Sequence, residues 1–151
     1  MARAVPGLLR YGAWRSVLQL GLRSPTSLAK LAAIAIEPRL ARYGAPPDGI
    51  YGDDVDPARA SAITASLQAE SLRVLIESLL PSGVTPARID APLHFFAAGR
   101  DTIIPAAEVE RCARAFNAPY TLYPDMGHTF QAERGYERVS RDIVRWIGAA
   151  T

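Results

Sequence analysis

Two short apolar runs, separated by one amphipathic segment, most constrain how this chain can fold. The first run covers residues 92–99 and the second covers 120–124, and each is bounded by proline or glycine. Apolar runs of this length are typical of parallel strands that are buried on both faces. Residues 105–116 between them have apolar side chains at helical spacing. These side chains belong to Val109, Cys112, Ala113 and Phe116.

A polar residue with catalytic potential follows each predicted strand. Asp101 comes just after the first run, and His128 comes just after the second. A right-handed crossover makes the two strands parallel, so both carboxyl ends lie at one edge of the sheet. A carboxylate bonded to one imidazole nitrogen fixes the tautomer, which lets the other nitrogen take a proton from a nucleophile. We therefore expect Asp101 and His128 to face one another.

The residues around both runs form a wider series. It comprises Ile89-Asp90-Ala91-Pro92, Gly99-Arg100-Asp101, Ile104-Pro105, Met126-Gly127-His128 and the closing Ile143-Val144-Arg145-Trp146-Ile147. This series resembles the C-terminal part of the α/β-hydrolases, in which the acid follows a late strand and the histidine follows the last one. The resemblance implies Asp101 as the acid and His128 as the base. Residues 68–72 further resemble bacterial members grouped near the acylglycerol lipases and lysophospholipases.

The nucleophile of such a triad is missing from these residues. Neither a G-x-S-x-G elbow nor an oxyanion loop of the His-Gly-Gly type occurs. The candidate serines lie in the helical part of the chain or its connection, and none stands on a strand-to-helix turn. They are Ser24, Ser27, Ser61, Ser66, Ser71, Ser78 and Ser82. We expect the second half of a longer fold, nearly inactive alone, that would cleave a small apolar ester once an N-terminal half completes it.

The first 84 residues carry helix signals and no strand signal. Ser24-Pro25 and Asp56-Pro57 each combine an N-cap residue with proline at the first helical position. A further helix is expected over residues 71–80. The predicted fold class is therefore α/β, with a helical cap over residues 1–84 followed by a β-α-β-α unit with a small parallel sheet over 85–151.

The closing helix has the clearest periodicity in the chain. Its apolar stripe consists of Tyr136, Val139, Ile143, Trp146 and Ile147. We expect this stripe to cover one face of the sheet and to hold the loop that carries His128. Burial of Trp146 and Ile147 would contribute roughly 1.5 to 3 kcal/mol for each side chain.

Composition argues against several other classes of protein. A net charge of +2 is too small to indicate a basic surface that binds nucleic acid, so we expect no nucleic-acid partner. His94, His128 and Cys112 have neither the spacing nor the companions of a metal site, and we expect no metal and no cofactor. Cys112 is interpreted as a small core residue, and His94 as a core histidine with its hydrogen bonds satisfied.

The start of the chain, Met1 to Leu22, contains Arg3, Arg10 and Arg15 and no acidic residue. Such a segment can be a transit peptide or a surface helix, and we interpret it as part of the cap. No apolar run approaches the roughly 20 residues of a membrane span. We expect a cytoplasmic protein without membrane association.

Simpler interpretations stay open for both site residues. Asp101 could be only a turn residue that binds nearby amides, and His128 only a loop histidine. Asp125, three residues before His128, is a poorer candidate for the acid. Three functions remain open: a hydrolase half, a non-catalytic remnant or interaction module that self-associates through sheet edges, and a membrane-surface protein that uses the basic N-terminal segment.

Overall fold

The computed structural model describes residues 13–37, 40, 50–52, 54–66, 71, 73 and 86–150. Over these residues the chain is mixed α/β, with five α-helices and a two-stranded parallel sheet. The elements are α2 (Ala13–Arg23), α3 (Pro25–Ile36), α4 (Pro57–Ala65), β1 (Phe95–Ala98), α6 (Ala106–Ala115), β2 (Tyr120–Tyr123) and α7 (Tyr136–Ala150). Two 3₁₀ turns, η2 (Pro86–Arg88) and η3 (Phe130–Ala132), complete this set.

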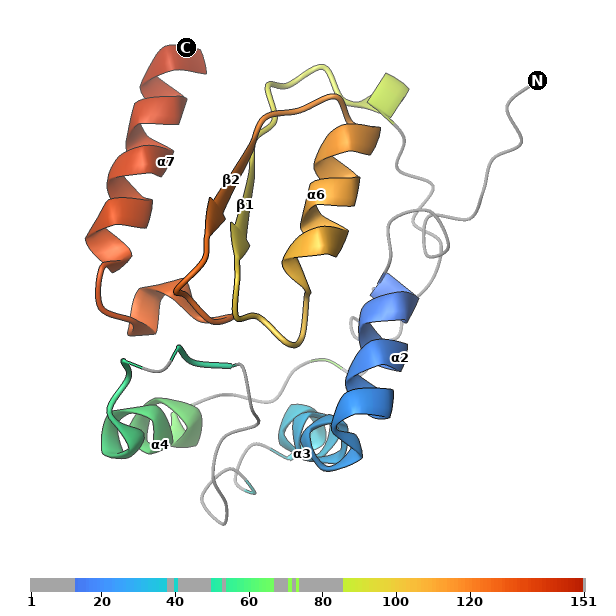
Figure 1. The fold of residues 1–151 in the computed structure, drawn as a ribbon, viewed down its shortest axis with the longest axis vertical. Coiled ribbons are helices and arrows are strands. Elements are labelled where there is room, and N and C mark those ends of the chain that lie inside the picture. The colour runs from blue at the N-terminus through green and yellow to red at the C-terminus, as the bar shows by residue number, and fades with distance from the viewer. Residues whose placement is uncertain are drawn as a thin grey trace, which may run out of the picture.

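The sheet part has the predicted order of strand, helix, strand and helix. β1 and β2 pair in parallel, with Phe95 opposite Tyr120 and Ala98 opposite Tyr123. Figure 1 shows three layers, with α7 on one face of the sheet and α6 on the other. The first strand begins at Phe95, later than predicted. Pro119 has no N–H, so it cannot donate the hydrogen bond that would extend the pairing to residues before Phe95.

The main apolar core lies between the sheet and α7. It consists of buried Ala98, Tyr123, Met126 and Val139, with Phe96, Phe130 and Ile143 packed against them. The Tyr123 hydroxyl donates to Asp142 Oδ2 at 2.8 Å, which ties β2 to α7. Burial, followed by this hydrogen bond, raises the pKa of Tyr123 to about 12.

The predicted burial along α7 was wrong at both ends of the helix. Val139 is buried, but the exposed fraction is 44% for Tyr136 and 49% for Ile147. Strands of four residues are about 13 Å long, whereas a helix of fifteen residues is about 22 Å long. The ends of α7 therefore extend beyond the sheet, and Ile147 does not contribute the expected burial energy.

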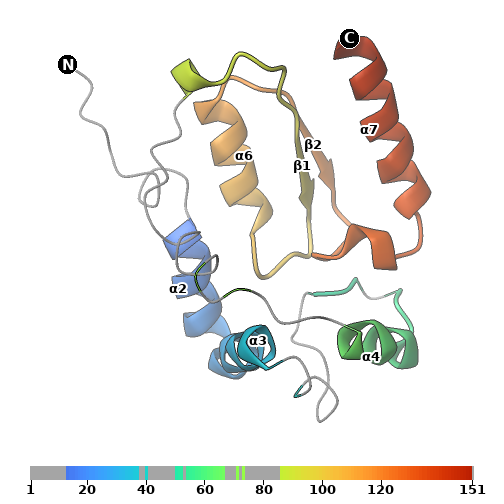
Figure 2. The ribbon, with the colours of Figure 1, turned by 180° about the vertical axis from the view of Figure 1, so that it is seen from behind.

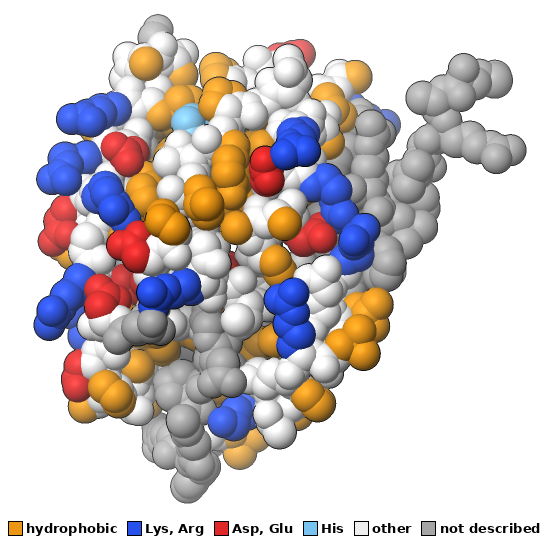
Figure 3. Space-filling view, viewed as in Figure 1, with side chains coloured by type: hydrophobic (Ala, Val, Ile, Leu, Met, Phe, Trp, Pro, Cys, Tyr) orange, Lys and Arg blue, Asp and Glu red, His pale blue; other side chains and the backbone are white. Residues whose placement is uncertain are grey.

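The other face of the sheet packs against α6. Ala97 and Ala113 are buried there, and the rings of Phe95 and Phe116 lie 6.0 Å apart. Because α6 lies mainly over β1, Leu122 of β2 keeps an exposed fraction of 44%. Figure 3 shows hydrophobic side chains gathered over the sheet, between the charged surfaces of α7 and α6.

Two predicted helix starts in the first part of the chain are confirmed. Ser24 caps α3 by accepting a hydrogen bond from the Ser27 N–H at 3.3 Å, and Pro25 is the first helical residue. Asp56 caps α4 in the same way through the Arg59 N–H at 3.0 Å. In both cases the side chain replaces a partner that the first helical turn cannot supply.

Figures 1 and 2 show α3, α4 and the end of α2 lying beyond the carboxyl ends of both strands. Arg15 of α2 joins the two parts, since its Nε lies 3.6 Å from Oε1 of the buried Glu108 on α6. The predicted boundary between residues 84 and 85 lies outside the described residues, as does nearly all of the helix expected over 71–80. No helix of the described residues has the length and apolar character needed to cross a bilayer.

Candidate active site

Asp101 lies in the turn that follows β1, and local hydrogen bonds fix its carboxylate. Oδ1 accepts hydrogen bonds from the backbone N–H groups of Ile103 and Ile104, both at 2.8 Å. The side chain is only 8% exposed. This is the role of a turn residue, but it leaves Oδ2 free to point elsewhere.

The turn after β1 and the turn after β2 leave the sheet side by side. The Gly99 N–H donates to Tyr123 O at 2.8 Å, and the Arg100 N–H donates to Met126 O at 2.9 Å. A Cβ atom on Gly99 would lie 2.6 Å from Cα of Pro124, so this close crossing requires glycine. The backbone thus brings the segments carrying Asp101 and His128 to the same place.

The expected contact between Asp101 and His128 is present. Nδ1 of His128 lies 2.9 Å from Oδ2 of Asp101. Because an ionised carboxylate can only accept, Nδ1 carries the proton of this bond. The hydrogen bond to Asp101 raises the pKa of His128 above its ordinary value of 6.5, although partial burial of the ring opposes the rise.

The other ring nitrogen of His128, Nε2, has no hydrogen-bond partner in the described part of the chain. The side chain is 35% exposed. Asp125, three residues before the histidine, is mostly exposed and bonds Arg138 at 2.9 Å instead. That bond lowers the pKa of Asp125. Asp101 is therefore the carboxylate that orients the imidazole.

The loop carrying His128 is also bound to residues 50–52, which we call the strap. Thr129 donates to Ile50 O twice, from its N–H at 3.0 Å and from Oγ1 at 2.7 Å. On the other side of His128, the Gly127 N–H donates to the carboxylate of Glu133 at 2.8 and 3.0 Å. The Gly52 N–H donates to the same carboxylate. No pattern in the sequence predicted these contacts.

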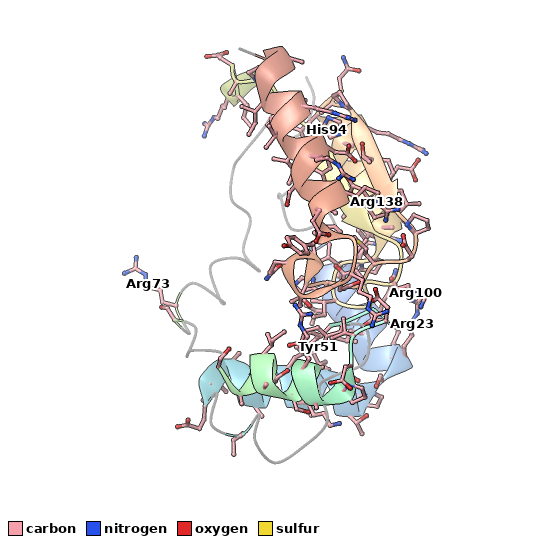
Figure 4. The ribbon with its side chains drawn as sticks, turned by 90° about the vertical axis from the view of Figure 1, so that its left-hand side faces the viewer. Arg23, Tyr51, Arg73, His94, Arg100 and Arg138 are labelled. Carbon is pink, nitrogen blue, oxygen red and sulfur yellow. The ribbon has the colours of Figure 1, made fainter. Side chains whose placement is uncertain are left out.

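Tyr51 connects the strap to α4. Its hydroxyl lies 2.9 Å from Oγ1 of Thr64, which is completely buried and donates to Ala60 O at 2.7 Å. Figure 4 shows Tyr51 between α4 and the loop that leads into α7, while His94 lies near the opposite end of α7. The helical part of the chain therefore contacts the segment that holds His128.

His94 and Cys112 are both structural in the described part of the chain. Nε2 of His94 bonds Thr121 Oγ1 at 2.8 Å, and the ring stacks on Phe96 with centroids 4.4 Å apart. Cys112 is half-buried, and burial raises its pKa although Arg111 opposes the rise. Within the described ranges, no three His, Cys, Asp or Glu side chains cluster in a way that could hold a metal ion.

Three of the candidate serines have structural hydrogen bonds near the ends of their helices. Ser24 Oγ donates to Ser27 Oγ at 2.8 Å, and Ser66 Oγ donates to Ile63 O at 2.7 Å. Ser27 is also buried. Ser78 and Ser82 lie outside the described residues. Among the described residues, no serine hydroxyl forms a hydrogen bond with His128.

Comparison with protein-family models, with curated proteins and with solved structures found no match. The geometry of the Asp101–His128 pair is therefore the basis for a functional assignment. A carboxylate that holds Nδ1–H and leaves Nε2 open can support general acid–base chemistry. Efficient catalysis would also require a nucleophile and donors for a developing oxyanion.

Proposed function

We propose that this chain supplies the acid and the base of a serine-type α/β-hydrolase. The observation that carries the proposal is the 2.9 Å bond from His128 Nδ1 to Asp101 Oδ2, formed just past the carboxyl ends of two parallel strands. Reaction centres of open α/β sheets collect at that edge. The nucleophile would come from a polypeptide that carries a G-x-S-x-G elbow.

Each residue has a defined task in the proposed reaction. His128 Nε2 takes the proton of the serine hydroxyl as that oxygen attacks an ester carbonyl carbon. The resulting imidazolium returns the proton to the leaving alcohol, and the cycle repeats with water in the deacylation step. Asp101 holds the Nδ1–H and stabilises the imidazolium charge, without itself taking the proton.

The position of the helical part supports an apolar ester as the substrate. Helices α3 and α4 lie beyond the edge that carries His128, where they would cover a bound substrate. Several apolar side chains of this part are exposed and offer an apolar surface. They are Val17, Leu18, Leu22, Ile36 and Leu40.

The proposal is tested by complementation. p-Nitrophenyl butyrate hydrolysis and labelling by a fluorophosphonate probe are measured with the chain alone, and after co-expression with an α/β-hydrolase N-terminal half that carries the elbow. We expect no labelling alone and hydrolysis in the complex, with His128→Ala lowering kcat by roughly 10⁴-fold or more. His94→Gln is the matched control, because His94 lies away from the pair. Equal rates for the complex and its His128→Ala variant would refute the proposal.

A second candidate is a non-catalytic interaction module. Among the described residues the sheet has only two strands, so each has an unpaired edge, and Leu122 beside one of them is exposed. Such edges are templates for pairing with another chain. Concentration-dependent association in analytical ultracentrifugation, weakened by Leu122→Lys and accompanied by no esterase activity in any complex, would favour this function over the first.

A further inference from the structure

Glu133 is a buried carboxylate that the proposed reaction does not use. It follows η3, five residues after His128, and is only 1% exposed. Carboxylates are rarely buried to this extent unless strong partners compensate for the lost water. Its partners therefore indicate what the residue does.

Those partners are backbone amides from two distant segments. The Gly127 N–H donates to both carboxylate oxygens, and the Gly52 N–H donates to the same group. Burial raises the pKa of Glu133, and these two amides oppose the rise; Asp54 and Asp125 add to it. The carboxylate thus joins the strap to the residue that directly precedes His128.

The two backbones at this junction are too close for side chains. A Cβ atom on Gly127 would lie 2.6 Å from the carbonyl carbon of Tyr51 and 2.7 Å from the nitrogen of Gly52. A Cβ atom on Gly52 would collide with Oε2 of Glu133. Only glycine at both positions lets the strap, the loop and the carboxylate meet.

The residue after His128 is held by the same strap. Thr129 donates two hydrogen bonds to Ile50 O, at 3.0 and 2.7 Å. Both chain neighbours of His128 are therefore fixed to residues 50–52. Because the chain on both sides of His128 is held in place, the imidazole can keep Nδ1 on Asp101. Placement of a catalytic group to within less than an ångström strongly affects catalytic efficiency.

We propose that Glu133 is a positioning residue for His128, acting through the amides of Gly127 and Gly52 to hold the imidazole against Asp101. The inference rests on the proposed function, because it takes His128 to be the base. A carboxylate is suited to this task, since it accepts two N–H groups at once. Glutamine would direct an NH₂ donor at one of them and lose that bond.

NMR spectroscopy of the full chain at neutral pH tests the inference without a complementing half. The readout is the His128 Nδ1–H signal, together with hydrogen exchange of the Gly127 amide. We expect Glu133→Gln to lose or broaden the Nδ1–H signal and to accelerate Gly127 exchange roughly tenfold or more. The matched control is Glu108→Gln, which alters a buried glutamate that is ion-paired with Arg15 and Arg111, away from the loop. It should leave both readouts unchanged.

A measurement on the wild-type chain covers the case in which Glu133→Gln does not fold. If Glu133 couples the strap to the loop, the Gly52 and Gly127 amides and the His128 Nδ1–H should exchange through one common opening. Independent exchange would overturn the inference, as would a folded Glu133→Gln variant with an unchanged Nδ1–H signal. Absence of the Nδ1–H signal from the wild-type chain would instead contradict the proposed function itself.

Discussion

The sheet part, residues 86–150, and the helical part before it are stabilised in different ways. The sheet part has an apolar core around Met126 and Tyr123, between the sheet and α7, and α6 covers the other face of the sheet. Among the described residues, the helical part buries Leu20, Ile50 and Ala60 together with the polar side chains of Ser16, Ser27 and Thr64, and none of these belongs to the main apolar core. Apolar burial is the main stabilising term in folding, so we expect the sheet part to contribute more stability than the described helical part.

The two parts of the chain also contribute differently to the candidate active site. Asp101 and His128 both lie in the sheet part, where backbone bonds between the two turns bring them together. The helical part contributes through the strap, which holds the residues on either side of His128. The sheet part therefore provides Asp101 and His128, and the helical part holds the loop that carries His128 in position.

Truncation of Met126 should give the largest effect on stability. Met126→Ala removes a side chain that is 1% exposed at the centre of the core, and it should lower the free energy of unfolding by about 2 to 5 kcal/mol. Leu20→Ala, which removes a buried side chain from α2, should cost less because Leu20 lies outside the main apolar core. Urea denaturation measures both. Equal losses would mean that the two parts unfold as one unit.

Two glycines of the sheet part differ in the space around them. Gly99→Ala places Cβ 2.6 Å from the backbone of Pro124 and should destabilise the fold by roughly 1 to 3 kcal/mol. Gly148→Ala, in α7 with no atom within 4 Å of the new Cβ, should stabilise it by about 0.5 kcal/mol. Thermal unfolding monitored by circular dichroism distinguishes them. A neutral Gly99→Ala would contradict the close crossing of the two turns.

Removal of a helix cap should act locally in the helical part. Asp56→Ala deprives the Arg59 N–H of its acceptor and should cost α4 about 1 kcal/mol. In the described part of the chain α4 contacts the sheet part through Tyr51 and the strap, so hydrogen exchange should accelerate in α4 and not in β1 or β2. Faster exchange in both strands would show that α4 stabilises the sheet directly.

The smallest expected effect is a pH dependence of stability that originates in the pair. The pKa of His128 is raised in the folded chain, so the stability it contributes is complete below 6.5 and is lost as the pH rises through the raised value. The difference in unfolding free energy between wild type and His128→Gln should therefore be largest below pH 6.5 and should shrink as the pH rises through the raised pKa. A difference in unfolding free energy that stays constant or grows with pH would contradict the contact between His128 and Asp101.

Local signals in the sequence predicted much of the fold and the pair of site residues. Apolar runs with helical spacing between them led to the β-α-β-α order, and Asp101 and His128 follow from that order because parallel strands share a carboxyl edge. The starts of α3 and α4 could be predicted because Ser24 and Asp56 act within one turn of chain. The assignment of catalytic roles stays a prediction.

Features that depend on distant segments could not be predicted in the same way. Glu133 stands in a polar stretch and would be expected at the surface, yet the approach of residues 50–52 buries it. The bond between Ile50 and Thr129 joins residues 79 positions apart, with no shared motif. The exposure of Ile147 results from the short length of the two strands. The spacing of apolar residues along α7 carries no information about strand length.

Titration of the His128 ring by NMR, in the wild type and in Asp101→Asn, measures the interaction between the two side chains. We predict that His128 titrates above 6.5 in the wild type, with its Nδ1 protonated in the neutral form, and that Asp101→Asn lowers its pKa. His94, bonded to Thr121, serves as the internal reference in both spectra. An ordinary His128 pKa that Asp101→Asn leaves unchanged would contradict the acid and base pair.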